Sequence, residues 1–423
     1  MPTKICLFED NKYSRLLPLA YFRPVYFLKC GARSLKEKVE AAYPRLTVDL
    51  HCRKYLAGIV RLQNPRLRVN ELTGEKYLFV NGRAIVGEQF AKAVPADGAV
   101  DTVYIHDGEV VAARLSGENL RRVAAQNREV YSIADFDGVA KKEVNVAFVR
   151  YSFDLIKQNG AQLRADYVST VKQVRGKKVR GKIALGVSLI NKKHIYIGEG
   201  SVLKPGVVID AEEGPVYIGK NVTVMSQSTI IGPAFIGDGS VIKVGAKIYE
   251  DTSIGPMCKV GGEVEASIID GYSNKQHDGF LGHSYLGSWV NLGAGTTNSD
   301  LKNNYGSVKV TVSGEVVDSG EQFVGVTIGD HTKTAINTVF NTGTVVGAVS
   351  NIVANGFPPK AVPSFAWGSE DGSYSTHEVE RAIETARKAM ARRKITLSND
   401  EVEVFRKVFT MTEHERSNDK LPR

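Results

Sequence analysis

Histidines in polar, glycine-containing segments are the first candidates for chemistry in this sequence. His283 occurs in GHSYLG, His277 in NKQHDGF and His331 in GDHTKT. A histidine can take a proton from a reacting group that lies within hydrogen-bond reach. A lone histidine is structural by default, but the Gly-rich, polar flanks of His283 favour a functional role, with His277 as the second candidate.

The stretch VNLGAGTTNSDLKNNYG, residues 290–306, follows His283 closely and holds three glycines and four asparagines. Polar, Gly-rich segments of this length are either disordered linkers or site loops held by a rigid scaffold. The aliphatic pattern described below includes Leu286 and Leu292, so the stretch belongs to a folded domain. We expect glycine to admit a substrate here and amides to bind hydroxyls. The alternative is an Asn-rich turn stabilised by its own side chains.

Charged residues in the first 160 positions form a second group of candidates. The cations Arg15, Arg23 and Lys29 could neutralise phosphate oxygens, and the carboxylates of Asp10 and Asp154 could hold Mg²⁺. Each of these side chains could equally belong to a surface ion pair.

Composition limits the class of protein. The 423 residues carry a net charge of +9 with 43% hydrophobic residues, which is typical of a chain of two or three domains with affinity for anions. The two basic clusters, residues 174–186 and RKAMARRK, lack aromatic interleaving or a nucleic-acid-binding motif. No apolar run is long enough for a membrane span, and four widely spaced cysteines fit a reducing compartment. We therefore expect a cytoplasmic protein that binds neither nucleic acid nor membranes.

A period of six is the strongest pattern in the chain. Aliphatic residues recur at Ile218, Val224, Ile230, Ile236, Ile242, Ile248, Ile254 and Val260, and the series continues to Ala266. This hexapeptide repeat is typical of a parallel β-helix, in which aliphatic side chains fill a narrow prism and stacked coils share one core.

The flanking regions have other patterns. KICLFE and KYLFVNG are typical of buried strands, SLKEKVEAAY of a helix capped by Ser34, and VYIHDGEVVAARL of a hairpin turning at Asp107-Gly108. Capping boxes at Ser375/Glu378 and Ser398/Glu401 predict two C-terminal helices. We predict an α/β domain at 1–171, a basic linker at 172–186, a β-helix at 187–368 and terminal helices at 369–423.

SYLGSWVNLGAGT and GDHTKTAIN resemble the acetyltransferase segments of sugar-1-phosphate nucleotidyltransferases that carry a left-handed β-helix tail. The similar proteins are bifunctional uridylyltransferase/acetyltransferases that make UDP-N-acetylglucosamine, using acetyl-CoA and Mg²⁺ as trimers. The resemblance implies His283 as general base, Tyr285 and Asn291 as contacts to the sugar phosphate and acceptor, Ala294 at the acetyl group and His331 on the CoA side. The family's phosphate-binding lysine aligns with Ser267, so Lys275 or Lys309 would replace it.

RLLPLAYFRPVYFL, residues 15–28, is similar to the opening of the nucleotidyltransferase domain, but with departures. EDNKYS replaces the glycine loop that approaches the phosphates, and the Pro-Lys pair becomes Arg23-Pro24. Asn81-Gly82-Arg83 stands where the family has Gly-Asp with a metal-binding carboxylate, which leaves Asp10 and Asp154 as candidate ligands.

Three hypotheses follow from these patterns. The chain is an enzyme of sugar-nucleotide synthesis that performs nucleotidyl transfer, acetyl transfer or both, on a sugar 1-phosphate with a nucleoside triphosphate and acetyl-CoA. Alternatively, it is an acyltransferase with a non-catalytic N-terminal binding or regulatory domain, or a non-enzymatic trimeric scaffold. The lost glycine loop favours the second over the first, and the intact SYLG and VNLGAGT segments disfavour the third.

Overall fold

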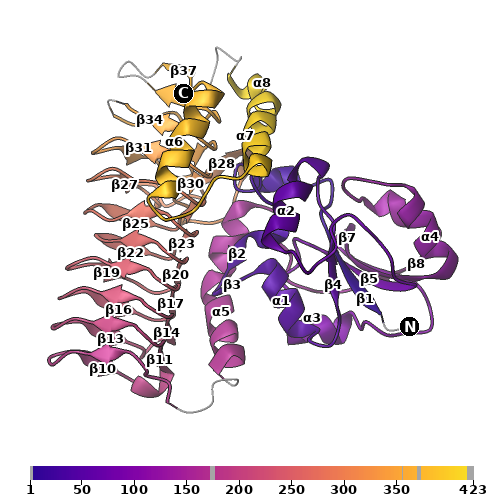
Figure 1. Ribbon diagram of the computed structural model, residues 1–423, viewed down its shortest axis with the longest axis horizontal. Coiled ribbons are helices and arrows are strands. Elements are labelled where there is room, and N and C mark those ends of the chain that lie inside the picture. Colours follow the sequence, from indigo (N-terminus) through magenta and orange to yellow (C-terminus); the bar gives the residue numbers. More distant parts are fainter. Residues whose placement is uncertain (1–2, 172–176, 355, 369–372, 417–423) are drawn as a thin grey trace.

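The computed structural model describes residues 3–171, 177–354, 356–368 and 373–416. It contains an α/β domain, a parallel β-helix and C-terminal helices (Figure 1). The predicted fold class is therefore confirmed: the chain pairs an α/β domain with a β-solenoid and ends in helices.

The first domain is built on one mixed six-stranded sheet. Its order is β4 (Val48–Leu50), β1 (Lys4–Phe8), β5 (Lys76–Asn81), β7 (Glu109–Ser116), β6 (Thr102–His106) and β8 (Ala140–Glu143). The helices are α1 (Leu35–Ala42), α2 (Ala57–Gln63), α3 (Glu88–Ala93), α4 (Gly117–Ala125) and α5 (Ser152–Val171), and a small hairpin joins β2 (Lys29–Cys30) to β3 (Arg33–Ser34). β1 alternates its side chains between two hydrophobic cores, with Ile5 and Leu7 in one and Cys6 and Phe8 in the other.

Local signals in this domain have the expected structures. Ser34 caps α1 through a capping box with Glu37. The hairpin between β6 and β7 turns at Asp107 and Gly108, which have φ angles of 47° and 74° and so form the turn that Asp-Gly favours.

The β-helix has three faces of short parallel strands. The nine-stranded face consists of β11 (Ile195–Ile197), β14 (Val216–Ile218), β17 (Ala234–Ile236), β20 (Thr252–Ile254), β23 (Ile268–Ile269), β26 (Tyr285–Leu286), β30 (Thr327–Ile328), β33 (Val345–Val346) and β35 (Ala361–Val362). A second face consists of β10 (Ser188–Ile190), β13 (Val208–Asp210), β16 (Thr229–Ile231), β19 (Lys247–Ile248), β22 (Glu263–Glu265) and β25 (Phe280–Gly282), then β27 (Thr297–Asn298) and β32 (Val339–Phe340). The third consists of β9 (Lys182–Ile183), β12 (Val202–Leu203), β15 (Thr223–Val224), β18 (Val241–Ile242), β21 (Lys259–Val260) and β24 (Asn274–Lys275), then β31 (Lys333–Thr334), β34 (Asn351–Ile352) and β36 (Ala366–Gly368).

The hexad residues from Ile218 to Val260 all lie in the core of the prism, at most 1% exposed. The prediction is wrong at its last member. Ala266 has a φ of 41° and lies at a corner, while Val264 takes the core position. The coil is shorter there, so the period of six no longer matches the positions that face inward.

Part of the predicted linker pairs with the β-helix. Residues 172–176 lie outside the described residues, but Val179 bridges Ile197 and β9 pairs with β12 in parallel. A hairpin of β28 (Lys309–Val312) and β29 (Glu315–Asp318) projects from a later coil, after the Asn-rich stretch.

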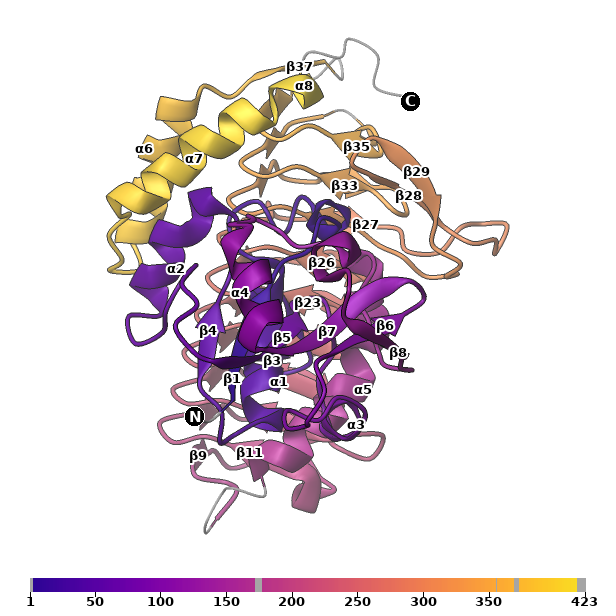
Figure 2. The same cartoon turned by 90° about the vertical axis from the view of Figure 1, so that its right-hand side faces the viewer.

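The C-terminal segment adds β37 (Tyr374–Thr376), α6 (Val379–Ala391), α7 (Asn399–Met411) and the short α8 (Glu413–Arg416). Ser398 and Glu401 form the predicted capping box. The box predicted at Ser375 and Glu378 is wrong, because Ser375 lies in β37 and Glu378 is the N-cap without a side-chain bond. Figure 2 shows α7 beside α2 of the first domain, and the two helices are in contact.

The first domain covers the nine-stranded face of the β-helix, with α5 between them (Figure 1). Outward-facing Ser253, Ile268 and Tyr285 are at most 1% exposed. Asn159 on α5 donates to the carbonyl of Asp251 over 2.6 Å. One hydrophobic cluster contains residues of the first domain, the β-helix and the C-terminal helices, so the three parts share a core.

Candidate functional sites

His283 is held in a fixed orientation at a corner of the β-helix, two residues before β26. Its backbone is left-handed, with a φ of 45°, and its N–H donates to the carbonyl of Glu265 in the preceding coil. Nδ1 lies 2.8 Å from Oδ2 of Asp300, and the ring stacks on Phe323 with 5.0 Å between centroids. Because Asp300 fixes Nδ1 as the donor, Nε2 is the nitrogen that can accept a proton.

A cavity of 230 Å³ lies beside His283 and is lined by four other segments. These are α5 (Phe153, Ile156, Lys157), two further corners of the β-helix (Asp251, Ala266) and the segment Glu321, Gln322, Phe323 and Val324. Nζ of Lys157 lies 2.5 Å from Oε1 of Glu321. The first domain therefore brings a cation to the same cavity as the β-helix histidine.

Carboxylates gather around this histidine. Burial raises the pKa of the Asp251 and Glu265 carboxyls, while the charge of a protonated His283 acts in the opposite direction on both. Asp300 makes the direct contact, with its side chain 14% exposed. Three carboxylates, of Asp251, Glu265 and Asp300, thus surround the imidazole.

Several residues that the resemblance assigned to the acceptor lie elsewhere. Tyr285 is fully buried and its hydroxyl accepts the backbone N–H of Lys29 over 2.9 Å, so it joins the two domains and does not face the cavity. Lys275 points into the prism, 2% exposed, and donates to the carbonyl of His277. Lys309 is exposed on β28. Neither lysine lines the cavity.

Asn291 and Ala294 lie on the far side of the same coil from His283. Asn291 bridges Asn274 and Lys333 in the third face, and its Oδ1 accepts from Nδ2 of Asn274. The carbonyl of Ala294 accepts the backbone N–H of Asn337. His277 is exposed and lies outside the cavity lining. The structure therefore does not bring these three residues together with His283.

His331 is buried in an aromatic cluster at another corner. It lies 7% exposed between Phe22, Trp289 and Phe405, and burial lowers the pKa of its imidazole well below the usual value. The position expected to face CoA thus packs against the first domain and α7.

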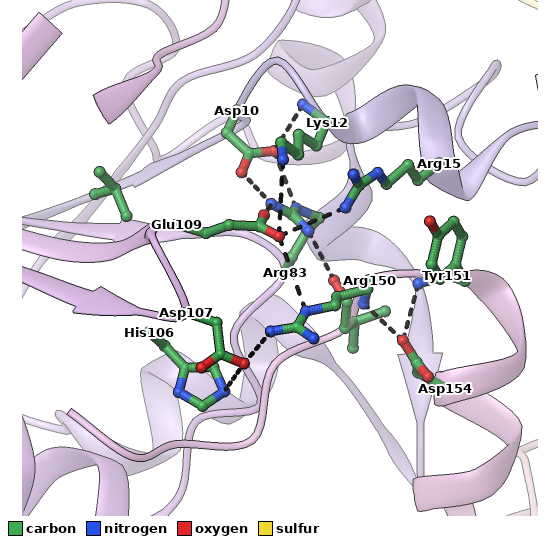
Figure 3. Close-up of polar contacts among 12 residues, drawn as sticks. Asp10, Lys12, Arg15, Arg83, His106, Asp107, Glu109, Arg150, Tyr151 and Asp154 are labelled. Atoms are coloured by element: carbon green, nitrogen blue, oxygen red, sulfur yellow. Dashed lines mark hydrogen bonds and ion pairs between the residues drawn. The ribbon is translucent and has the colours of Figure 1, made fainter. Parts of the chain in front are cut away.

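The second predicted site forms around Arg83 (Figure 3). β1 and β5 are parallel with Phe8 opposite Asn81, so the residues that follow both strands meet at one edge. Gly82 permits this approach, because a Cβ there would lie 2.9 Å from Tyr26 and 3.1 Å from the carbonyl of Phe8. Asp10 and Arg83 consequently lie in direct contact.

The guanidinium of Arg83 is fully buried and makes ionic contacts on two sides. Nε donates to Oδ1 of Asp10 over 3.0 Å, and Nη2 donates to Asp10 and Glu109. Nη1 donates to the carbonyl of Val149, and the ring of Phe148 lies 4.5 Å from the guanidinium carbon. The cation is therefore held by two carboxylates, one carbonyl and one ring.

The predicted Mg²⁺ ligands do not fit a metal. Asp10 is bound by Arg83 and by Nδ2 of Asn81, and Asp154 caps α5 by accepting the backbone N–H groups of Arg150 and Tyr151 at 2.7 and 2.9 Å. Among the residues that the structure describes, no group of three His, Cys, Asp or Glu side chains could hold a metal ion. The prediction of a metal site at Asp10 and Asp154 is not supported by this geometry.

The predicted phosphate-binding cations Arg15 and Arg23 lie at two different places in the structure. Arg15 reaches the Arg83 cluster, with Nη1 3.5 Å from Glu109. Arg23 turns toward the β-helix, where its guanidinium bridges Asp270 and Asp330, the latter at 2.6 Å. Arg23 is therefore a residue of the interface between the first domain and the β-helix. Of these two arginines, only Arg15 lies beside the Arg83 cluster, where it could bind a phosphate.

Sequence reasoning missed Asp300, Lys157 and Glu109. Asp300 lies within the Asn-rich stretch itself, so its acidic side chain among amides was the available signal. Lys157 and Glu109 gave none, because their places depend on how α5 and the β6–β7 hairpin pack.

Comparison with known proteins agrees with both halves of the resemblance. Residues 5–174 match the family model described as sugar nucleotidyl transferase. The bifunctional protein GlmU of Rippkaea orientalis is 33% identical over 146 residues, which cover 34% of this chain and 27% of that protein. The bifunctional sugar-1-phosphate nucleotidylyltransferase/acetyltransferase of Sulfurisphaera tokodaii is 34% identical over 116 residues, covering 27% of this chain and 28% of that protein.

A longer match, to the bifunctional protein GlmU of Trichlorobacter lovleyi, is 27% identical over 279 residues and covers 58% of each chain. In each of these three matches, less than two thirds of the relative's length is covered. Among the described residues, no helix combines the length and apolarity needed to cross a bilayer.

Proposed function

We propose that the chain is a transferase of sugar-nucleotide synthesis whose β-helix acetylates the amine of an amino-sugar 1-phosphate. The resemblance of both halves to bifunctional nucleotidyltransferase/acetyltransferases supports this assignment. The observation that carries it is the His283–Asp300 pair, 2.8 Å apart, at a cavity that also receives Lys157.

In the proposed reaction, Nε2 of His283 takes a proton from the sugar ammonium. The amine then attacks the carbonyl carbon of acetyl-CoA, and a C–N bond forms. The C–S bond breaks, and the leaving CoA thiolate takes the second proton lost by the nitrogen. The imidazolium then releases its own proton to solvent. Asp300 keeps Nδ1 as the donor and stabilises the imidazolium between these steps. Lys157 is positioned to neutralise the sugar phosphate, in place of Lys275 and Lys309.

The match of residues 5–174 to the sugar nucleotidyl transferase model supports a second activity, in which the first domain joins the sugar 1-phosphate to a nucleoside triphosphate. The Arg83 contact with Asp10 favours a second candidate, in which this domain binds nucleotide without the usual Mg²⁺-dependent transfer. We further propose a cytoplasmic homotrimer, as the resemblance implies.

The test is an assay of purified protein with glucosamine 1-phosphate and acetyl-CoA, following release of free thiol. His283→Ala should lower turnover by about 10²–10⁴-fold, the usual worth of a positioned proton acceptor. His277→Ala is the matched control and should keep its turnover. A His283→Ala protein with normal turnover would exclude the proposed base, and loss in His277→Ala alone would transfer the role to that residue. Pyrophosphate release with a panel of nucleoside triphosphates and Mg²⁺ would show whether the first domain is catalytic.

A further inference from the structure

The Arg83 cluster has more basic side chains at its surface than a structural ion pair requires. Nitrogens of Lys12, Arg15 and Arg150 lie 3.9, 3.5 and 3.8 Å from Glu109, and Nη2 of Arg150 also pairs with Asp107 at 2.5 Å (Figure 3). Their side chains are 39%, 32% and 37% exposed, so solvent or a ligand can reach each one.

One carboxylate serves as the shared partner. Within the described part of the chain, Glu109 is the only carboxylate that pairs with Lys12 or with Arg15, and Nη2 of Arg83 also contacts it from below. Burial would raise the pKa of the Glu109 carboxyl, but Arg83, Lys12 and Arg15 lower it below the usual value. Glu109 is therefore an anion bound by four cations, three of which lie at the surface.

Arg83 occupies, with one permanent positive charge, the position between the Asp10 and Glu109 carboxylates. A guanidinium stays charged at all physiological pH values and binds carboxylate or phosphate oxygens in a fixed planar geometry. Because it is 0% exposed and bonded to Asp10, Glu109 and Val149, no divalent cation can bind Asp10 without first displacing it. The structure thus contains a permanent internal cation beneath a basic surface.

We propose that this cluster is a metal-independent polyphosphate site, in which the Arg83 guanidinium stands between Asp10 and Glu109 in place of a metal ion and Glu109 is a counter-ion displaced by the incoming nucleoside triphosphate. Displacement leaves Lys12 and Arg15 to bind the phosphates, with Arg150 beside them still paired with Asp107, while Asp10 continues to neutralise Arg83. The inference deepens the proposed nucleotide role of the first domain and rests on it.

Equilibrium binding tests the site without requiring turnover. The probes are inorganic tripolyphosphate and UTP, titrated into the intact protein by calorimetry with either EDTA or excess Mg²⁺. Wild-type protein should bind both probes in EDTA at least as tightly as in Mg²⁺. Binding that needs Mg²⁺, or no binding of either probe in either condition, overturns the proposal.

Variants test separately the basic side chains that would bind phosphate and the carboxylate that would be displaced. Lys12→Ala/Arg15→Ala should weaken binding at least tenfold. Glu109→Gln keeps the shape and should tighten binding about tenfold, because the internal competitor loses its charge while Arg83 retains Asp10. Lys92→Ala removes a lysine that is 72% exposed on α3 and pairs with Glu88, and should change nothing. Circular dichroism of each variant establishes that it is folded.

The outcomes distinguish this site from the acetyl transfer proposed above. A Glu109→Gln variant whose affinity is unchanged or weaker refutes displacement, even where wild-type protein binds nucleotide. Retained thiol release from acetyl-CoA in a protein that binds neither probe would refute the polyphosphate site and leave the β-helix function standing. If both probes bind in EDTA but no thiol is released from acetyl-CoA, the acetyl transfer is refuted and the polyphosphate site stands.

Discussion

Asp300 and His283 are 17 residues apart in the chain and in direct contact, with Oδ2 of the carboxylate 2.8 Å from Nδ1 of the imidazole. The contact depends on the coil that carries the Asn-rich stretch returning to the same corner of the β-helix. It makes Asp300 a positioning residue that acts through His283.

Asp300→Asn should lower turnover by between about 10²- and 10⁴-fold, because an amide can donate to Nδ1 and so hold the wrong tautomer. The acceptor KM should stay within about twofold, since Asp300 acts through the base and not on the sugar. Steady-state kinetics of acetyl transfer measure both quantities. Asp318→Asn, on the exposed β29, is the control, and a rise in KM with normal kcat would assign Asp300 to substrate binding instead.

Tyr285→Phe should destabilise the protein without impairing acetyl transfer. The change removes the acceptor of the buried Lys29 N–H, and an unsatisfied buried donor costs about 1–3 kcal/mol. Urea unfolding measures the loss, with Tyr305→Phe at a 67% exposed position as the control. A large rise in acceptor KM at unchanged stability would favour the sugar-phosphate role that the resemblance implied.

Arg23→Met should weaken the contact between the first domain and the β-helix. It leaves Asp270 and Asp330 without their shared cation, and removing one partner of a buried ionic group costs about 3–5 kcal/mol. Thermal unfolding and limited proteolysis would detect the loss. Arg33→Met is the control, because Arg33 donates to the hydroxyl of Thr170 and pairs with no carboxylate within the described ranges.

Lys275→Met should stabilise the protein at pH 7. Burial lowers the pKa of the Lys275 ammonium to about 8, below its value of 10.5 in an unfolded chain. Between pH 8 and 10.5 the unfolded state therefore binds more protons, so this group makes stability rise with pH. At pH 7 the charged form costs the folded state about 1–3 kcal/mol. Urea unfolding at pH 7 and pH 10 should show the gain of the variant shrinking at high pH, whereas Lys309→Met should show neither effect.

The homotrimer proposed above predicts a trimeric mass in solution. Because the first domain covers the nine-stranded face, the prisms of such a trimer would meet through their other faces. Light scattering at micromolar concentration should give three times the chain mass of 46.1 kDa. A monomer mass would contradict the prediction.

The sequence predicted those parts of the fold in which a local pattern repeats. Ile218 through Val260 recur every six residues because each coil has the same length, and Ser34 and Ser398 cap helices through neighbours three residues away. The pattern failed at Ala266, where one coil is shorter, and nothing local shows where a coil shortens.

Residue roles were less predictable, because they depend on contacts between distant segments. His283 could be chosen from its flanks, but Tyr285 was assigned to the substrate although its hydroxyl faces the first domain. Charge alone makes Arg23 and Asp10 candidates, and their partners, Asp330 and Arg83, lie 307 and 73 residues away. No periodicity connects such pairs.

The 20-residue helix α5 runs beside the β-helix for about 30 Å and is bonded to it at several heights. Arg164 donates to the carbonyl of Glu213, Asn159 to that of Asp251, and Lys157 pairs with Glu321. Each coil adds about 4.8 Å to the length of the β-helix. One coil added or deleted between residues 213 and 321 would move some of these partners by about 4.8 Å, beyond hydrogen-bond reach. The bonds of α5 are therefore compatible with only one number of coils in this part of the β-helix.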